Sequence, residues 1–270
     1  MRLVRTIPEL REILAEERRR DDPLSGQTAG AAVHPAGSIG LVPTMGYLHP
    51  GHLSLVEASR AQNRFTVMSI FVNPTQFGPG EDFERYPRDL ERDRAIAEAA
   101  GVDLLFYPEP AEMYPAGYRT YVTVEGLSER LCGRFRPGHF RGVATVVSKL
   151  FHLVEPQRAY FGQKDAQQVA VLRKMVRDLN LDLEIVVCPT VREPDGLALS
   201  SRNVYLSPAE RQAATVLSRA LFWAKDRVRE GEREAAVLLA GMRQMLEAEP
   251  LCRLEYLEVV DAENLEPLAR

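Results

Sequence analysis

Cysteine is scarce in this chain, and long apolar runs are missing. The 270 residues include three cysteines, Cys132, Cys188 and Cys252, which lie far apart and form no CxxC pair. An odd number at such distances supports neither a disulfide framework nor a zinc site, and it favours thiols kept in a reducing compartment. No segment approaches the ~20 apolar residues of a membrane span, and the charged opening MRLVRTIPELREILAEERRR contains no apolar signal segment. We therefore expect a cytoplasmic protein.

A large excess of positive charge is also missing. The chain has 34 Lys and Arg against 38 Asp and Glu, which gives a net charge of −4. Because nucleic-acid binding depends on neutralising phosphates, nucleic acid is not expected as the main partner, while a small anionic ligand held by local cations stays open. The hydrophobic share of 45% and the charged share of 27% are typical of a globular protein and exclude a disordered chain.

Short apolar runs alternate with helical patterns along most of the chain. Runs of this length and character are typical of strands buried on both faces of a parallel sheet. The runs cover 39–42, 65–72, 102–107, 158–161 and 183–188, and the helical patterns cover 52–63, 88–100, 142–154 and 166–179. The alternation predicts an α/β fold with a Rossmann-like, doubly wound parallel sheet.

Two regions depart from this alternation. Residues 21–38 are rich in Gly, Ala, Ser, Pro and Asp, which predicts a flexible surface insertion. After about residue 190, a capping box at Ser207 predicts a long helix, a second helix is expected near 233–248, and 253–260 has the pattern of a strand. We therefore expect a first domain over 1–190 and a small α+β lid domain over 191–270.

The segment PTMGYLHPGH at 43–52 follows the first apolar run and opens the next helical pattern. Gly46 and Gly51 allow tight turns, and the helix start offers unpaired amides and partial positive charge to a phosphate. His49 and His52 could donate to phosphoryl oxygens at that point. The alternative is that both are ordinary cap and turn residues, and zinc is disfavoured because no further ligands have suitable spacing.

Two further polar clusters also follow apolar runs, where ligands bind in open α/β sheets. Asn73 suits a sharp turn, and Gln76 beyond it can both donate and accept hydrogen bonds. Lys164 stands near a helix start, an awkward place for a cation unless an anion binds there. Asp165 is a natural N-cap of that helix, and Gln168 falls in its first turn.

A fourth cluster occupies 192–203, near the expected domain junction. Its Gly, Ser and Arg content predicts a mobile loop that closes on phosphates with Arg202 as a clamp, or else a solvated interdomain linker.

Two lesser features remain. A basic loop at 134–141 is either solvent-facing or meets a carboxylate. Asp89 and Asp93 lie four residues apart on one helix face, which suits either Mg²⁺ held through water or a solvated face.

The strings PTMGYLHPGH, FVNPTQF, RPGHFRG, YFGQKDAQQ and DGLALSSRN, in this order, resemble the pantoate–β-alanine ligase family. HxGH alone would indicate only the broad nucleotidyltransferase group, whereas five strings together are far more selective. The resemblance runs from about residue 39 to 210. It implies a cytoplasmic, usually dimeric ligase that depends on ATP and Mg²⁺, with a Rossmann-like domain and a smaller C-terminal domain.

The resemblance also implies roles for individual residues. His52 would be the proton donor with His49 as its companion, Gln76 and Gln168 would hold pantoate, and the β-alanine site would overlap that of Gln76. Asp93 would meet Mg²⁺, although its neighbour here is Arg92, where the family often has an acidic residue. The ATP site would comprise Met45, Gly46, Tyr47, Leu48, His49, Pro50, Gly51, His52, Gly162, Gln163, Lys164, Asp165, Val191, Leu199, Ser200, Ser201 and Arg202.

The implied reaction activates a carboxylate that would not otherwise react with an amine. Pantoate attacks the α-phosphorus of ATP, pyrophosphate leaves, and β-alanine displaces AMP from the pantoyl adenylate to give pantothenate. His49, His52, Lys164 and Arg202 suit the negative charge that grows on the pyrophosphate. Two alternatives are a nucleotidylyltransferase, which would leave its acceptor nucleotidylated, and a nucleotide-binding module without turnover.

Overall fold

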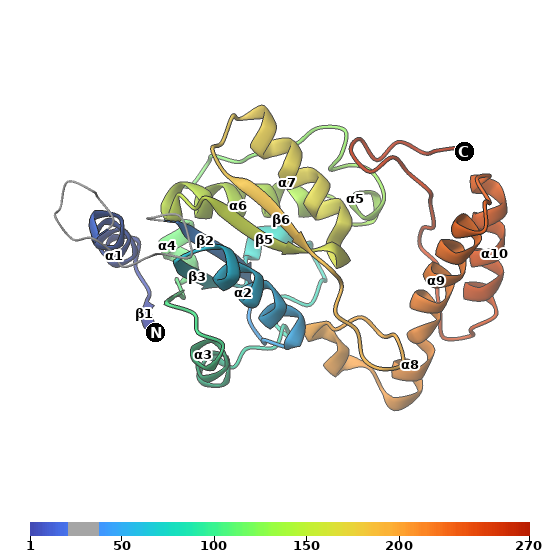
Figure 1. The fold of residues 1–270 in the computed structure, drawn as a ribbon, viewed down its shortest axis with the longest axis horizontal. Helices are drawn as coiled ribbons and strands as arrows, with labels where there is room; N and C mark the ends of the chain where they lie inside the picture. The colour runs from blue at the N-terminus through green and yellow to red at the C-terminus, as the bar shows by residue number, and fades with distance from the viewer. Residues whose placement is uncertain (21–37) are drawn as a thin grey trace.

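A six-stranded, fully parallel sheet forms the centre of the molecule in the computed structural model, which describes residues 1–20 and 38–270 (Figure 1). The strand order is β1-β4-β3-β2-β5-β6. The strands are β1 (Arg2–Val4), β2 (Ile39–Thr44), β3 (Phe65–Ile70), β4 (Leu104–Phe106), β5 (Arg158–Gly162) and β6 (Glu184–Cys188). The predicted doubly wound parallel sheet is confirmed. The predicted insertion at 21–38 lies outside the described residues, apart from Ser38.

Helices cover both faces of the sheet because alternate strand residues face opposite ways. Leu41 and Val67 pack in one cluster with α1, α6 and α7, while Val42 and Met68 pack in another with α2 and α3. These helices are α1 (Ile7–Arg20), α2 (Pro50–Gln62), α3 (Leu90–Ala99), α6 (His139–Val154) and α7 (Ala166–Asp178), and short helical turns are α4 (Pro110–Met113), α5 (Cys132–Phe135), η2 (Pro74–Gln76) and η3 (Gln163–Asp165).

The chain reverses its winding at β2, which lies between β3 and β5. The connection from β2 to β3 runs through α2 on one face, and the connection into β5 runs through α6 on the other. At such a point, loops leave the carboxyl ends of two neighbouring strands in opposite directions. A crevice forms between these loops. The topology therefore positions a ligand site above β2, β3 and β5.

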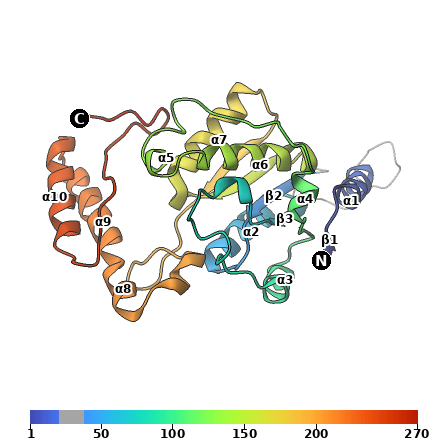
Figure 2. The ribbon, with the colours of Figure 1, turned by 180° about the vertical axis from the view of Figure 1, so that it is seen from behind.

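Three helices follow the sheet, and the last two of them form a small core of their own. They are α8 (Pro208–Ala213), α9 (Thr215–Arg229) and α10 (Ala235–Glu247), preceded by η4 (Ser201–Tyr205). Val216 and Ala220 of α9 pack against Leu238 and Met242 of α10. Both views show this helix pair at the end of the molecule opposite α1 (Figures 1 and 2). The single long helix expected after Ser207 is two helices, and the division at residue 190 stays a prediction.

The strand predicted at 253–260 is wrong. Among the described residues of this segment only Val260 forms a β-bridge, to Pro267, because no strand lies beside it to complete a ladder. The tail instead runs back to the sheet domain, where Tyr256 stacks on Phe135 and Leu265 is buried in the main core. No helix in the described parts of the chain combines the length and apolar character that a bilayer crossing requires.

Candidate active site

A cavity of about 250 Å³ opens at the carboxyl ends of β2, β3, β5 and β6, where the topology predicts a ligand site. The four residues expected to meet the triphosphate, His49, His52, Lys164 and Arg202, line this one cavity although they come from distant parts of the chain. The other predicted site residues in its wall are Met45, Gly51, Gln76, Gly162, Asp165, Gln168, Val191, Leu199, Ser200 and Ser201.

Five residues of the predicted ATP site do not reach the cavity wall. Gly46, Tyr47, Leu48 and Pro50 form the turn that carries the histidines, and Gln163 lies in η3 beside Lys164. These five residues therefore contribute the backbone that positions the cavity residues.

The two histidines cap α2 as well as lining the cavity. His49 is the N-cap residue, and its Nδ1 accepts the Gly51 N–H at 3.1 Å. His52 Nδ1 accepts the His49 N–H at 3.3 Å, which completes a capping box. Pro50 starts the helix at a position where no N–H is needed. The two interpretations of HxGH, helix cap and ligand site, thus apply to the same side chains, because a cap that uses Nδ1 leaves Nε2 available.

Burial makes both histidines weak bases. It lowers the pKa of His52 to about 3, with help from His49 and Lys164, and it lowers the pKa of His49 to about 4, with help from the charges of Lys164 and Arg92. Both rings are consequently neutral at pH 7. The same positive charges that repel a proton from these rings attract an anion into the cavity.

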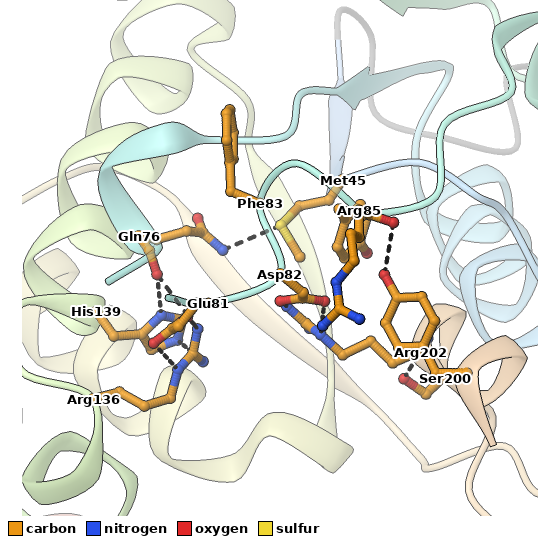
Figure 3. Close-up of polar contacts among 12 residues, drawn as sticks. Met45, Gln76, Glu81, Asp82, Phe83, Arg85, Arg136, His139, Ser200 and Arg202 are labelled. Carbon is orange, nitrogen blue, oxygen red and sulfur yellow. Dashed lines mark hydrogen bonds and ion pairs between the residues drawn. The ribbon is translucent and has the colours of Figure 1, made fainter. Parts of the chain in front are cut away.

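Gln76 is held by a short network under the cavity. Asn73 Nδ2 donates to Gln76 Oε1 at 3.0 Å and to the Gly142 carbonyl at 3.1 Å. Gln76 Nε2 lies 3.2 Å from the Met45 sulfur (Figure 3). The Asn73 side chain also accepts the Thr75 N–H, as expected for a residue chosen for a sharp turn. The buried amide of Gln76 therefore has a fixed orientation.

The Lys164 region differs from its prediction in one respect. Asp165 occupies the predicted N-cap position of α7, but its side chain makes no capping hydrogen bond. Its carboxylate instead lies 3.3 Å from Lys164 Nζ, and both side chains are exposed. Gln168 stands in the first turn of α7 and faces the cavity, as predicted.

Two arginines at the cavity are paired with adjacent acidic residues, Glu81 and Asp82 (Figure 3). Arg202 donates from two nitrogens to Asp82 at 2.8 and 2.9 Å, and this contact lowers the pKa of the Asp82 carboxyl. Arg136 donates to Glu81 at 3.0 Å and lies 3.2 Å from His139. The basic loop at 134–141 thus meets a carboxylate.

Glu81 and Asp82 were not among the predicted site residues. They lie in a loop without periodicity between β3 and α3, and no spacing relates them to the arginines that they meet. Arg136 and His139 belong to the predicted basic loop at 134–141, whose pattern does not indicate their partners. Such pairings depend on the tertiary fold, which brings residues 55 and 120 positions apart into contact.

Asp93 lies behind the histidine turn and outside the main cavity. Its two oxygens accept the backbone N–H groups of Tyr47, at 2.6 Å, and Leu48, at 2.7 Å. The role of Asp93 toward Mg²⁺ stays a prediction. No group of three or more His, Cys, Asp or Glu side chains in residues 1–20 and 38–270 is arranged to hold a metal by itself.

Comparisons with known proteins agree with the motifs. The sequence model of the pantoate–β-alanine ligase family matches residues 2–270. The pantothenate synthetase of Moorella thermoacetica is 58% identical over 270 residues, which is 100% of this chain and 90% of the relative. That of Acetivibrio thermocellus is 64% identical over 228 residues, 84% of this chain and 81% of the relative.

Solved structures give the same result. Pantothenate synthetase from Thermus thermophilus has 53% identity and a TM-score of 0.89, and the match covers 100% of this chain and 90% of that one. Pantoate–β-alanine ligase from Francisella tularensis, complexed with β-γ ATP and β-alanine, has 33% identity and a TM-score of 0.71 over 91% of this chain and 86% of that one. The chain therefore belongs to the pantoate–β-alanine ligase family, whose members use ATP to condense pantoate with β-alanine.

Proposed function

We propose that this enzyme makes pantothenate in two steps within the single cavity. A pantoate carboxylate oxygen attacks the α-phosphorus of ATP. The bond between the α-phosphorus and the oxygen that bridges to the β-phosphorus breaks, and pyrophosphate leaves. The β-alanine amine then attacks the acyl carbon, loses a proton and displaces AMP. The observation that carries this proposal is that His49, His52, Lys164 and Arg202 line the same cavity as the buried amide of Gln76.

The tautomers fixed by the helix cap support hydrogen-bond donation by both histidines. In each ring Nδ1 accepts a backbone N–H, so the hydrogen of the neutral ring resides on Nε2. Each Nε2–H can donate to a phosphate oxygen. Protonating His52 would place a second hydrogen on Nδ1, against the His49 N–H. The arrangement thus favours His52 as a hydrogen-bond donor to the developing charge over His52 as a source of a transferred proton.

Lys164 and Arg202 supply the positive charge that the leaving pyrophosphate needs. Lys164 is exposed at the cavity mouth and forms a weak ion pair with Asp165, so its ammonium can reorient toward phosphate at little cost. Arg202 is held by Asp82 and would exchange that carboxylate for phosphate oxygens of similar geometry. Both residues would act mainly by positioning and charge stabilisation, as phosphoryl transfer requires.

The pantoate end of the cavity combines polar and apolar walls. Gln76 and Gln168 offer amides suited to the hydroxyl and carboxylate groups of pantoate. Val143, Val147 and Leu150 of α6 form an apolar wall, which suits the dimethyl carbon of the same substrate. We place β-alanine beside Gln76, where it would reach the acyl carbon after pyrophosphate has left.

We also propose that Mg²⁺ enters with the triphosphate, because Mg²⁺ is usually held by one or two carboxylates together with substrate phosphates. Asp165, at the cavity wall beside Lys164, would hold it there, and Mg²⁺ would neutralise phosphate charge. A homodimer, a cytoplasmic location and a closing motion of residues 191–270 are further proposals. The family resemblance supports the first two. The separate core of α9 and α10 and the place of Ser200 in the cavity wall support the third.

An AMP-release assay tests the proposed function. Purified enzyme receives ATP, Mg²⁺, pantoate and β-alanine, and each is omitted in turn. We expect stoichiometric AMP, pyrophosphate and pantothenate from the complete mixture only. The comparison variant is His52→Ala, which removes the Nε2–H donor and should lower kcat by about 10²- to 10³-fold. ADP formation, a nucleotidylated pantoate as the final product, or equal turnover without β-alanine would contradict the proposal.

A further inference from the structure

The turn before α2 has a backbone conformation that most residues avoid. Gly46 has φ +85° and Tyr47 has φ +51°, so two successive residues lie in the left-handed region. Glycine enters this region easily, whereas tyrosine does so only when its surroundings compensate for the cost. The following residues, Leu48 and His49, lead directly into the helix cap that orients both imidazoles of the candidate site.

Hydrogen bonds from α3 and η4 hold this turn on both sides. Asp93 Oδ2 accepts the Tyr47 N–H at 2.6 Å, and Asp93 Oδ1 accepts the Leu48 N–H at 2.7 Å. Arg92 donates to the Leu48 carbonyl at 2.8 Å, and its guanidinium lies 4.7 Å from the centre of the Tyr47 ring. From the other side, the Ser201 hydroxyl lies 3.1 Å from the Tyr47 carbonyl oxygen. The peptide groups of the turn are thus paired despite its unusual geometry.

We propose that Asp93 and Arg92 are positioning residues, which fix the left-handed turn and thereby hold His49 and His52 in the cavity. Neither residue lines that cavity, so neither acts on substrate directly. Asp93 is 1% exposed, and a carboxylate buried to this degree needs hydrogen-bond donors. The two backbone N–H groups and Arg92, whose guanidinium lies 3.2 Å from Oδ1, supply them.

This role differs from Mg²⁺ binding, which the family resemblance implies for Asp93. Each Asp93 oxygen already accepts a short backbone hydrogen bond, and a metal ion would compete with those donors. Asp93 and Asp89 also border a separate cavity of about 190 Å³. A metal bound there would draw on both carboxylates. The two roles therefore predict different behaviour for the same substitution at these two positions.

The test compares Asp93→Asn with the matched control Asp89→Asn on the same helix. An asparagine at 93 has one acceptor oxygen, so one of the two backbone N–H groups faces an NH₂ group instead. Asp89 is the exposed N-cap of α3, a position that asparagine fills equally well. Three quantities are measured for each variant: kcat and KM, the Mg²⁺ concentration for half-maximal rate, and hydrogen–deuterium exchange of peptides covering 45–48.

We expect Asp93→Asn to lower kcat by about 10- to 100-fold, because small misplacements of catalytic groups have effects of this size. The half-saturating Mg²⁺ concentration should stay within about twofold, and exchange at 45–48 should be at least about tenfold faster. Asp89→Asn should change none of these by more than about twofold. The exchange measurement does not depend on turnover, so it separates failure of this inference from failure of the proposed reaction.

Several results would overturn the inference. One is a rise of about tenfold or more in the Mg²⁺ requirement of Asp93→Asn, with kcat restored by excess Mg²⁺. Another is unchanged kcat and unchanged exchange at 45–48. If Asp93→Asn does not fold, Arg92→Met decides, because Arg92 is exposed and methionine keeps the contact with the Tyr47 ring. A several-fold lower kcat with faster exchange supports the inference, and wild-type values for both contradict it.

Discussion

Replacing Gly142 with alanine should perturb the proposed pantoate site through a single added methyl group. Gly142 lies in the first turns of α6 and packs against the turn η2, which carries Gln76. A Cβ at this position would lie 2.4 Å from the Thr75 carbonyl oxygen and 2.6 Å from the Gln76 backbone nitrogen. Both atoms belong to the backbone, so no rotation of a side chain relieves the overlap. Either η2 or the start of α6 must move.

The size of the effect follows from these distances. The distance of 2.4 Å between the added Cβ and the Thr75 carbonyl oxygen must increase by roughly 0.6–1 Å to reach the 3.0–3.4 Å of tight contacts in real proteins. Overpacking costs about 1–3 kcal/mol, and alanine regains about 1 kcal/mol over glycine inside a helix. A net loss of about 1 kcal/mol lowers Tm by about 2–4 °C in a chain of this size. A shift of about 1 Å in Gln76 should lower kcat/KM for pantoate by about 10- to 100-fold.

The assay is steady-state AMP release with pantoate varied and then with ATP varied, together with thermal unfolding. We expect the change in KM to be confined to pantoate, while KM for ATP stays within about threefold. Gly78→Ala is the matched control, because a Cβ there would meet only the Glu81 side chain, at an ordinary 3.4 Å. If Gly142→Ala had an unchanged kcat/KM for pantoate and an equal or higher Tm, the reasoning from close packing would be refuted.

Three further predictions concern the charges of the cavity. Lys164→Ala should lower kcat by about 10²- to 10³-fold in the AMP-release assay with an unchanged Tm, and a loss below about threefold would contradict its role. Asp82→Asn weakens the ion pair that ATP must displace from Arg202, so it should lower KM for ATP by about two- to fivefold. A higher KM would mean instead that Asp82 orients Arg202 for ATP. Burial lowers the pKa of His52 to about 3 and of His49 to about 4, so from pH 6.5 toward 4 the unfolded chain binds protons that the folded chain does not. The free energy of unfolding, measured by urea titration, should therefore decrease as the pH is lowered from 6.5 toward 4, by up to about 1.4 kcal/mol per pH unit for each histidine. His52→Gln should reduce that slope.

The central sheet was predictable because its strands are continuous apolar runs between amphipathic helices. The runs beginning at Ile39, Phe65 and Arg158 are strands close to the predicted bounds. The edge strand Arg2–Val4 was missed, since three residues next to charged neighbours carry too little pattern. The segment 253–260 was wrongly predicted as a strand although its pattern is clear. Alternation describes the two faces of a strand but does not supply a neighbouring strand with which it can pair.

The candidate site was predictable where residues follow strands, and less so elsewhere. Parallel strands end at one edge, so the polar residues after them were expected to converge, as His52 and Lys164 do. The Glu81 and Asp82 pairs could not be predicted, because the orientation of a loop without periodicity depends on tertiary contacts. The contact of Asp93 with the Tyr47 turn was missed for a different reason, since an acidic residue in a first helical turn usually needs no partner beyond its own helix.

The transfer of oxygen from pantoate to AMP tests the central claim most directly. Pantoate labelled with ¹⁸O in its carboxylate is incubated with the enzyme, ATP, Mg²⁺ and β-alanine, and the products are analysed by mass spectrometry. If the carboxylate attacks the α-phosphorus in this cavity, each AMP should contain one ¹⁸O and pyrophosphate should contain none. Unlabelled AMP, or label in inorganic phosphate or pyrophosphate, would contradict the account.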